Sequence, residues 1–349
     1  MEIALLLNSN NRLSSYSEKF KEILIKNNIP YKLIDPNSNT LLDDIKGCTH
    51  LLFRHTMGDT DGLIYETIAN IAQNIYHIKC DPNFETYWPY ENKIKEFYLL
   101  KSHDFPIINS DIFWNYAQAD AFINKAQFPI VAKLPKGAGS SNVVIVNSLK
   151  DGKKIINQVF NRGVKTGGLN NNSSLTSLSN MGIFKYSKAL LRSQLINIGL
   201  LKYKTDYPMW QIQKDSILFQ KYLPNNSFDT RVTVIGKRAF AFRRFVRKND
   251  FRASGSGNFN MDPDKIDIRC IEIAFSISKK LNFSTMAYDF LYDEDKKPYV
   301  NEISYCFIDL AVKNCPGYWD ESLTFHQGHN WPQYYQLTDF LHNKVLKTI

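Results

Sequence analysis

The chain has 349 residues, of which 44% are hydrophobic and 22% are charged. This composition is typical of a globular protein, and the length excludes a single small core and predicts two or three packed subdomains. No apolar run approaches the roughly 20 residues that cross a bilayer, so we expect no membrane segment. The net charge of +9 is compatible with a nucleic-acid surface or with an electropositive cleft for small anions. Because most basic residues are scattered, we favour the cleft.

The cysteines are odd in number and show no C-x-x-C spacing, which argues against a disulfide framework or a zinc site. They are Cys48, Cys80, Cys270, Cys306 and Cys315. The opening "MEIALLLNSN" is short and lacks a basic leader, so we interpret it as a buried strand rather than a signal peptide. Together these features predict a protein of the reducing cytoplasm.

Residues 1–88 alternate between strand and helix patterns. "EIALLL", "YKLID" and "THLLFRH" are predicted strands, and "SYSEKFKEILIKNN" and "LIYETIANIAQN" have helical apolar spacing. This alternation predicts a parallel sheet covered by helices, that is, a Rossmann-like α/β domain. Ligands of such sheets lie at the carboxyl ends of the strands, so Arg54 and His55 are candidate substrate contacts. The alternative for each is an ordinary surface or core residue.

The pattern changes after "DPNFETYWPY". A helix, "ENKIKEFYLLKSH", precedes strands at "PIVAKL" and "SNVVIV", and residues 165–182 are rich in Asn, Ser and Gly, which predicts a flexible insertion. A basic helix, "KYSKALLRSQLINIGLL", follows. From residue 217 we expect strands at "ILFQKYL", "DTRVTVIG" and "RAFAFRRFV" and a helix from about 264 to 281. The predicted domains are 1–88, 89–216 and 217–349.

"YDFLYDEDKKPYVNEIS", residues 288–304, is predicted to form a hairpin in which each strand carries one acid. If the tightest point of the turn lies between Asp295 and Lys296, Asp289 faces Glu302. Directly opposed carboxylates repel each other. The pair is therefore either a solvated feature of an edge hairpin or a seat for a divalent cation.

"PIVAKLPKGAGSSNVVIV" places Lys133 at the end of one strand and a Gly/Ser loop before the next. Gly137 and Gly139 would let the backbone approach a phosphate closely, and successive N–H groups can bind an anion. The alternative is a tight hairpin turn.

Taken in order, these segments resemble the ATP-grasp enzymes over roughly residues 88–310. The resemblance implies an ATP-grasp fold after a Rossmann-like first domain, in a mixed α/β (α+β) chain that uses ATP and two magnesium ions. By position, it assigns phosphate contacts to Lys93, Lys133 and the lid residues Gly137, Gly139 and Ser140; adenine contacts to Gln220, Lys221 and Leu223; the ribose contact to Asp229; and metal ligands to Asp289, Glu302 and Ser304.

Two positions depart from the family pattern. Ser304 stands where an asparagine metal ligand is usual, and Asn301 is a weak substitute because it should point to the other face of its strand. Ala287 stands where many of these ligases have an arginine. The run "DTRVTVIGKRAFAFRRFVRKNDFRASGSGN" looks like that of the ribosomal-protein glutamate ligases, so Arg231 and Arg252 are the predicted catalytic cations. Arg243 is a further substrate candidate or, alternatively, part of a solvated basic face.

The resemblance implies a carboxylate–amine ligase that forms an acyl phosphate and releases ADP and phosphate. Its partners would be a small carboxylate and a small amine, and a homodimer is compatible with the sequence. The tail "CPGYWDESLTFHQGHNWPQYY" resembles tails of ATP-grasp proteins of surface-polysaccharide synthesis, which suggests a sugar-acid substrate and makes Trp319, His326 and His329 minor substrate candidates. The alternative is that the tail packs against the core. The alternatives are a kinase-like phosphotransferase and a non-catalytic protein that binds nucleotides or nucleic acid.

Overall fold

The computed structural model describes residues 2–55, 58–137, 141–165, 169, 211–247, 253, 257–342 and 346–349. The chain divides into two compact units. The first contains Met1–Thr56, Thr60–Asn109 and Leu223–Ile349, and the second contains Met57–Asp59 and Ser110–Tyr222. The predicted boundary at residue 88 lies inside the first unit, and the three-domain division remains a prediction.

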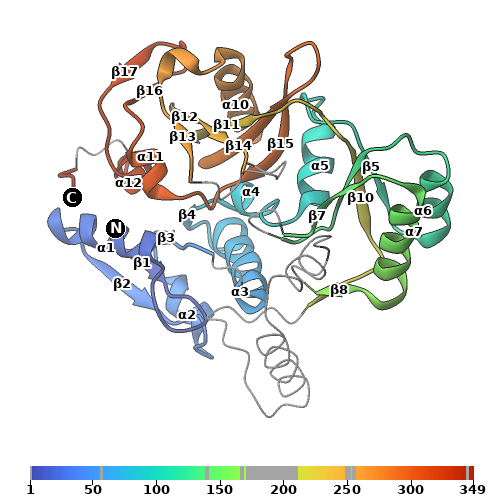
Figure 1. Ribbon diagram of the computed structural model, residues 1–349. Helices are drawn as coiled ribbons and strands as arrows, with labels where there is room; N and C mark the ends of the chain where they lie inside the picture. Colours follow the sequence, from blue (N-terminus) through green and yellow to red (C-terminus); the bar gives the residue numbers. More distant parts are fainter. Residues whose placement is uncertain are drawn as a thin grey trace, which may run out of the picture. The chain divides into compact units, whose positions relative to one another are not determined.

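The first unit opens with a sheet in which neighbouring strands are parallel, in the order β2-β1-β3-β4. The strands are β1 (Ile3–Leu6), β2 (Tyr31–Ile34), β3 (His50–Leu52) and β4 (Lys79–Asp81), and the helices between them are α1 (Ser15–Lys26), α2 (Leu41–Lys46) and α3 (Asp59–Asn70), the last continued by a π-helical turn, Ile71–Ile75 (Figure 1). Ser14 caps α1 by accepting a hydrogen bond from the Ser17 N–H. The predicted parallel α/β arrangement is confirmed, although β4 was not predicted.

A second sheet of the first unit has antiparallel neighbours in the order β15-β14-β11-β12-β16-β17, with β13 paired to β12. Its strands are β11 (Phe228–Ile235), β12 (Arg238–Phe245), β13 (Phe259–Asn260), β14 (Thr285–Tyr292), β15 (Pro298–Ser304), β16 (Gly317–Trp319) and β17 (Phe325–Gln327). The predicted strands of this region and its predicted helix, observed as α10 (Ile268–Lys280), are present. Helix α10 packs against β11, β12 and β14 through Cys270, Ile271 and Ala274. It therefore covers one face of the sheet.

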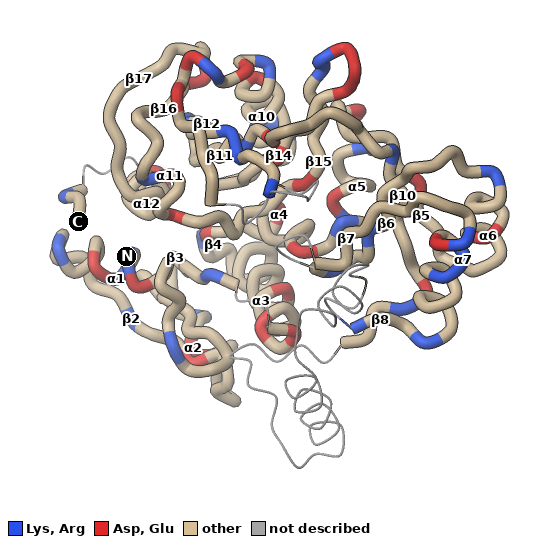
Figure 2. The backbone as a smooth tube through the Cα atoms, viewed as in Figure 1, with Lys and Arg blue, Asp and Glu red and all other residues tan. Residues whose placement is uncertain are grey.

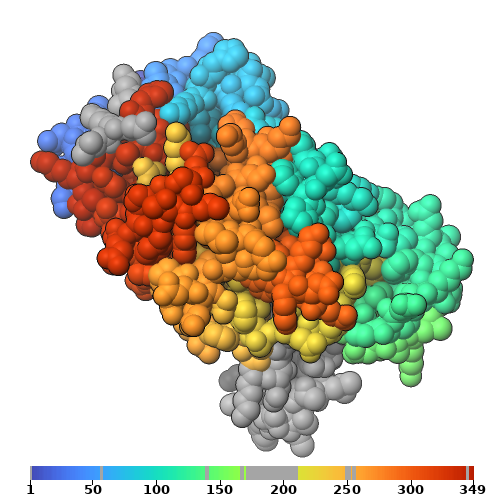
Figure 3. Space-filling view, turned by 90° about the horizontal axis from the view of Figure 1, so that it is seen from above, coloured from blue at the N-terminus to red at the C-terminus, as the bar shows by residue number. Residues whose placement is uncertain are grey.

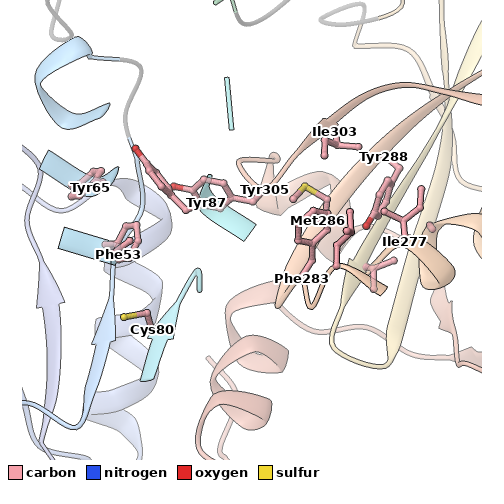
Figure 4. Close-up of a cluster of buried hydrophobic side chains, with 14 of the residues drawn as sticks. Phe53, Tyr65, Cys80, Tyr87, Ile277, Phe283, Met286, Tyr288, Ile303 and Tyr305 are labelled. Carbon is pink, nitrogen blue, oxygen red and sulfur yellow. The ribbon is translucent and has the colours of Figure 1, made fainter. Parts of the chain in front are cut away.

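The two sheets of the first unit share a hydrophobic core. Phe53, Tyr65 and Tyr87 belong to the same buried cluster as Tyr288 and Tyr305, as Figure 4 shows. The remaining helices of this unit are α4 (Phe84–Tyr87), α5 (Lys93–Lys101), α11 (Asp309–Lys313) and α12 (Pro332–Phe340), with a short 3-10 turn at Pro263–Lys265. Helix α12 packs on α1, so N-terminal and C-terminal segments lie side by side (blue and red in Figure 3). This continuous core explains why the two sheets form one compact unit.

The second unit contains an antiparallel sheet in the order β5-β10-β6-β7. The strands are β5 (Ser110–Phe113), β6 (Ile130–Lys133), β7 (Val143–Val146) and β10 (Ile217–Lys221), the helices are α6 (Tyr116–Ile123) and α7 (Leu149–Asn157), and further elements are a π-helical turn, Gln158–Arg162, and the paired strands β8 (Val164–Lys165) and β9 (Ile212–Gln213). Alanine, isoleucine and valine side chains from α6, α7 and the sheet form its core. The predicted strands β6, β7 and β10 are confirmed. Most of the predicted insertion and the basic helix lie outside the described residues.

Candidate active site

The β14–β15 hairpin places Asp289 directly opposite Glu302, as predicted from the turn. That prediction assumed one uniform register along the hairpin, but the register shifts next to Asp289. Phe290 pairs with Val300, which leaves Asn301 as the extra residue of a β-bulge. The strict alternation used against Asn301 as a ligand therefore does not hold at this position.

One face of the sheet carries an alternating row of acids and arginines. Arg231 pairs with Asp289 across β11 and β14, and Asp229 pairs with Arg244 across β11 and β12. Arg231 Nε and Nη2 donate to the two Asp289 oxygens at 2.6 and 2.7 Å. Arg244 Nε and Nη2 donate to the two Asp229 oxygens at 2.7 and 2.6 Å. Blue and red segments lie side by side in this part of the sheet in Figure 2.

Arg244 connects the two pairs. Its Nη2 lies 2.7 Å from Asp289 Oδ2, so it contacts acids on β11 and on β14. The Arg244 and Asp289 side chains are only 5% and 7% exposed. Burial alone raises the pKa of Asp289, but the guanidinium groups of Arg231 and Arg244 outweigh it and hold this pKa well below its usual range. Asp289 is therefore ionised at neutral pH and fully engaged by arginine.

A second charged group lies beside Glu302. Helix α5 packs on β15 and begins at Lys93, whose Nζ is 3.9 Å from Glu302 Oε1. Glu96, one turn further along α5, is buried, and its Oε2 accepts a hydrogen bond from the Ile303 N–H at 3.2 Å. The Glu302 side chain is 30% exposed. Glu302 is thus the acid of the opposed pair that reaches solvent.

The opposed acids, as arranged, do not fit a shared magnesium ion. Magnesium needs carboxylate oxygens that can face it, and both oxygens of Asp289 accept hydrogen bonds from guanidinium groups. Among the described residues, no group of three or more His, Cys, Asp or Glu side chains is placed to hold a metal. Ser304 points its hydroxyl toward the Cys306 carbonyl, at 3.4 Å. Glu302 remains suitable as a single carboxylate ligand.

Arg54 has the surroundings of a structural residue. It is 6% exposed, and its guanidinium donates to the carbonyls of Tyr305 and Phe307 at 2.8 and 2.9 Å. The same group lies 3.8 Å from the ring centre of Tyr16. These contacts join the end of β3 to the segment after β15 and give Arg54 a structural role, and a substrate role for it remains a prediction.

His55 lies in a cluster of tyrosines. Its Nδ1 is 2.8 Å from the Tyr87 hydroxyl, and its ring packs against Tyr65, Tyr87 and Tyr90. The Tyr305 hydroxyl accepts a hydrogen bond from the His55 N–H at 3.0 Å. The aromatic contacts give His55 a packing role, and a substrate role for it remains a prediction.

Arg243 projects to the face of the sheet opposite the acid–arginine row, because it alternates with Arg244 along β12. Its guanidinium lies 4.4 Å from the ring centre of Phe228. It is therefore not part of the row. In the tail, Trp319 is buried against Phe325, and His326 Nε2 lies 2.7 Å from Asp320 Oδ2. His329 is exposed.

The predicted phosphate and adenine residues lie mainly in the second unit. Lys133 ends β6 and is buried, and Gly137 has φ +148°. A Cβ on Gly137 would lie 2.4 Å from the Ser141 carbonyl oxygen, so this turn requires glycine. On β10, Gln220 is buried and Lys221 is exposed. Leu223 belongs to the first unit and is buried. Gly139, Ser140 and Arg252 lie outside the described residues.

Asp229 is engaged by arginine, and its assignment as a ribose contact remains a prediction. Both its oxygens accept hydrogen bonds from Arg244, and the residue is 7% exposed.

Two charged residues of the site, Arg244 and Glu96, were not predicted from the sequence. The two-residue turn at Gly236 and Lys237 fixes the β11–β12 register, so it could have placed Arg244 opposite Asp229. Glu96 could have been found from its i+3 spacing to Lys93 on a helix.

No protein-family model and no curated protein matches the sequence. Solved structures do match at low identity. A RimK domain ATP-grasp protein from Sphaerobacter thermophilus is 13% identical over 97% of this chain and 99% of its own, with a TM-score of 0.53. The ADP complex of purK, N5-carboxyaminoimidazole ribonucleotide synthetase, is 12% identical over 100% and 78%, with a TM-score of 0.58. D-cycloserine synthetase DcsG is 13% identical over 99% and 100%, with a TM-score of 0.54. This chain therefore has the ATP-grasp fold.

Proposed function

We propose that this ATP-grasp chain is an ATP-dependent carboxylate–amine ligase. The observation that carries the proposal is the charged face of the β11–β15 sheet, where Lys93 and Arg231 lie beside the opposed acids Asp289 and Glu302. Among the similar structures, one is a D-cycloserine synthetase and another is the ADP complex of an N5-carboxyaminoimidazole ribonucleotide synthetase. A charged face on such a fold is suited to a reaction of phosphate and carboxylate groups.

In the proposed reaction, a substrate carboxylate oxygen attacks the γ-phosphorus of ATP, and the bond to the β-phosphate oxygen breaks to release ADP. An amine then attacks the carbonyl carbon of the acyl phosphate, loses a proton and expels inorganic phosphate, which leaves an amide. Such phosphoryl transfer requires mainly alignment and charge neutralisation. Lys93 and Arg231 would supply positive charge on the first unit. Magnesium accompanying ATP would neutralise phosphate charge, with Glu302 as its protein ligand.

Further assignments follow from the resemblance. Lys133 and Gly137 would contact the phosphates, Gln220, Lys221 and Leu223 would surround the adenine, and Arg252 would be a second catalytic cation. Among the described residues, no helix has the length and apolar character needed to cross a membrane. We place the protein in the cytoplasm. A homodimer is a further proposal, which light scattering would test against the chain mass of 40.4 kDa.

The test is a screen of carboxylate–amine pairs for ADP and phosphate, beginning with sugar acids and amino acids in view of the tail resemblance. A ligase releases ADP and phosphate in equal amounts and only when both substrates are present. A stable phosphorylated product formed without amine would favour the kinase alternative. AMP and pyrophosphate as products would contradict both readings. Glu302→Gln serves as the inactive control, and Glu294→Gln, an exposed acid in the turn of the same hairpin, as the matched active control.

A further inference from the structure

We propose that Asp289 and Asp229 are buried anchors of the acid–arginine row and position Arg231, and that Glu302 holds a cation without Asp289. The row consists of Asp229, Arg244, Asp289 and Arg231, in order of contact, and crosses the adjacent strands β12, β11 and β14. The part of this inference that concerns the cation rests on the proposed use of ATP. The part that concerns the anchors rests on the sheet alone.

Both carboxylate oxygens of Asp229 and of Asp289 already accept hydrogen bonds from arginine. Asp229 accepts two hydrogen bonds from one guanidinium, and Asp289 accepts two from Arg231 while Arg244 Nη2 lies 2.7 Å from its Oδ2. Paired guanidinium–carboxylate contacts of this length are among the stronger hydrogen bonds in proteins and fix both side chains. A magnesium ion on Asp289 would have to approach within about 2.1 Å of an oxygen beside two positive groups.

Burial and charge point in the same direction. The acid–arginine row contains two acids and two arginines, so the formal charges of these four side chains cancel without a metal. Removing one member of a buried pair leaves an uncompensated charge in the interior, which is strongly destabilising. Glu302 differs, because its side chain is 30% exposed and its contact with Lys93 Nζ is 3.9 Å long. A cation can therefore reach Glu302 without breaking the contacts of the acid–arginine row.

The position of Arg231 follows from these contacts. Its side chain is 16% exposed, whereas Arg244 is 5% exposed. Asp289 holds Arg231 through Nε and Nη2, which fixes the plane of the guanidinium. Asp289 and Arg244 are thus positioning residues, and Arg231 is the more exposed of the two arginines in the acid–arginine row.

The first experiment measures thermal unfolding in EDTA, without nucleotide. We expect Asp289→Asn to lower the melting temperature by roughly 5 °C or more, because Arg231 and Arg244 lose their shared anion. Glu302→Gln should change it by less than about 2 °C. Asp295→Asn and Glu294→Gln, exposed in the turn of the same hairpin, are the matched controls. An unchanged or higher melting temperature for Asp289→Asn would overturn the anchor role, because relief of carboxylate repulsion is what a metal seat predicts.

The second experiment measures Mn²⁺ binding by electron paramagnetic resonance at a concentration of the non-hydrolysable analogue AMPPNP that saturates every variant. Glu302→Gln should weaken Mn²⁺ binding by tenfold or more, and this partly exposed position keeps the test open if Asp289→Asn fails to fold. Asp289→Asn should change Mn²⁺ affinity by less than about threefold. Unaltered Mn²⁺ affinity in Glu302→Gln, or an equal loss in Asp289→Asn, would overturn the assignment of the cation to Glu302.

The third measurement separates positioning from general stability. If Asp289 acts through Arg231, Asp289→Asn should weaken AMPPNP binding in the wild-type background and cause no further loss in Arg231→Gln. Additive losses would contradict the positioning role. A wild-type protein that binds no AMPPNP would remove the proposed function, while the unfolding experiment in EDTA would still decide the anchor role.

Discussion

Glu96 is a buried acid whose protonation should be visible in the stability of the protein. It is 6% exposed, and the Ile303 N–H donates to its Oε2. Burial and the neighbouring charge of Glu302 raise the pKa of Glu96 from 4.5 to about 8, although Lys93 opposes them. At neutral pH the folded protein therefore keeps a proton that the unfolded chain has released.

Between pH 4.5 and about 8 the folded state binds more protons than the unfolded state, so the stability from this proton is lost as the pH rises through that window. We expect Glu96→Gln, which keeps the neutral shape, to lie within about 1 kcal/mol of the wild type near pH 5 and to exceed it at pH 8 by on the order of 4 kcal/mol. Urea unfolding at both pH values measures the difference, with exposed Glu294→Gln as the control. Parallel pH profiles for wild type and Glu96→Gln would rule out a buried neutral acid.

At the scale of elements, the β11–β12 hairpin sets the register on which the acid–arginine row depends. Gly236 and Lys237 form its turn, and Gly236 has φ +54°. A Cβ at Gly236 would lie 2.1 Å from Asp339 Oδ2, an oxygen that Arg238 binds at 3.0 Å. The turn thus needs glycine both for its backbone conformation and for the approach of α12.

We expect Gly236→Ala to destabilise the protein by about 1–3 kcal/mol, because alanine is strained at positive φ and the new methyl group displaces the Asp339 carboxylate. Gly257→Ala is the matched control, since Gly257 has φ +72° but no described atom lies within 4 Å of the place its new methyl group would take. It should show the cost of backbone strain alone. Denaturant midpoints compare the two variants, and equal losses would mean that contact with α12 contributes nothing.

At the scale of the whole molecule, the net charge of +9 favours an anionic ligand, and the one we propose is ATP. A ligand that binds only the folded state stabilises it by mass action, by about 2.7 kcal/mol at one hundred times its Kd. ATP with magnesium should therefore raise the melting temperature.

Lys133→Met should remove most of that increase, because methionine keeps the apolar stem of this buried lysine and deletes its charge. Lys150→Ala, an exposed position on α7 in the same unit, is the control and should respond to ATP as the wild type does. Thermal shift titrations with ATP and magnesium provide the comparison. Identical shifts in wild type and Lys133→Met would remove the phosphate role of Lys133.

Much of the fold could be predicted from the sequence because it depends on local patterns of residues. Alternating strand and helix signals predicted the parallel sheet of the first unit, and the polar turn at Asp293–Lys297 predicted that Asp289 faces Glu302. Such features depend on residues close together in the chain, whose backbone periodicity and turn chemistry decide the outcome. The bulge at Asn301 was not predicted, because one extra residue in a strand leaves no signal in the apolar pattern.

The partners of the acids were decided only by the tertiary structure. Asp289 meets Arg231, 58 residues earlier in the chain, because β14 lies beside β11. It meets Arg244 because β12 lies on the other side of β11. Lys93 and Glu96 reach Glu302 because α5 packs on β15. By itself the sequence determined which residues carry charge and which neighbours in a hairpin oppose each other. Strand order and helix packing determined which charges are neutralised, because burial and pairing depend on contacts between distant segments.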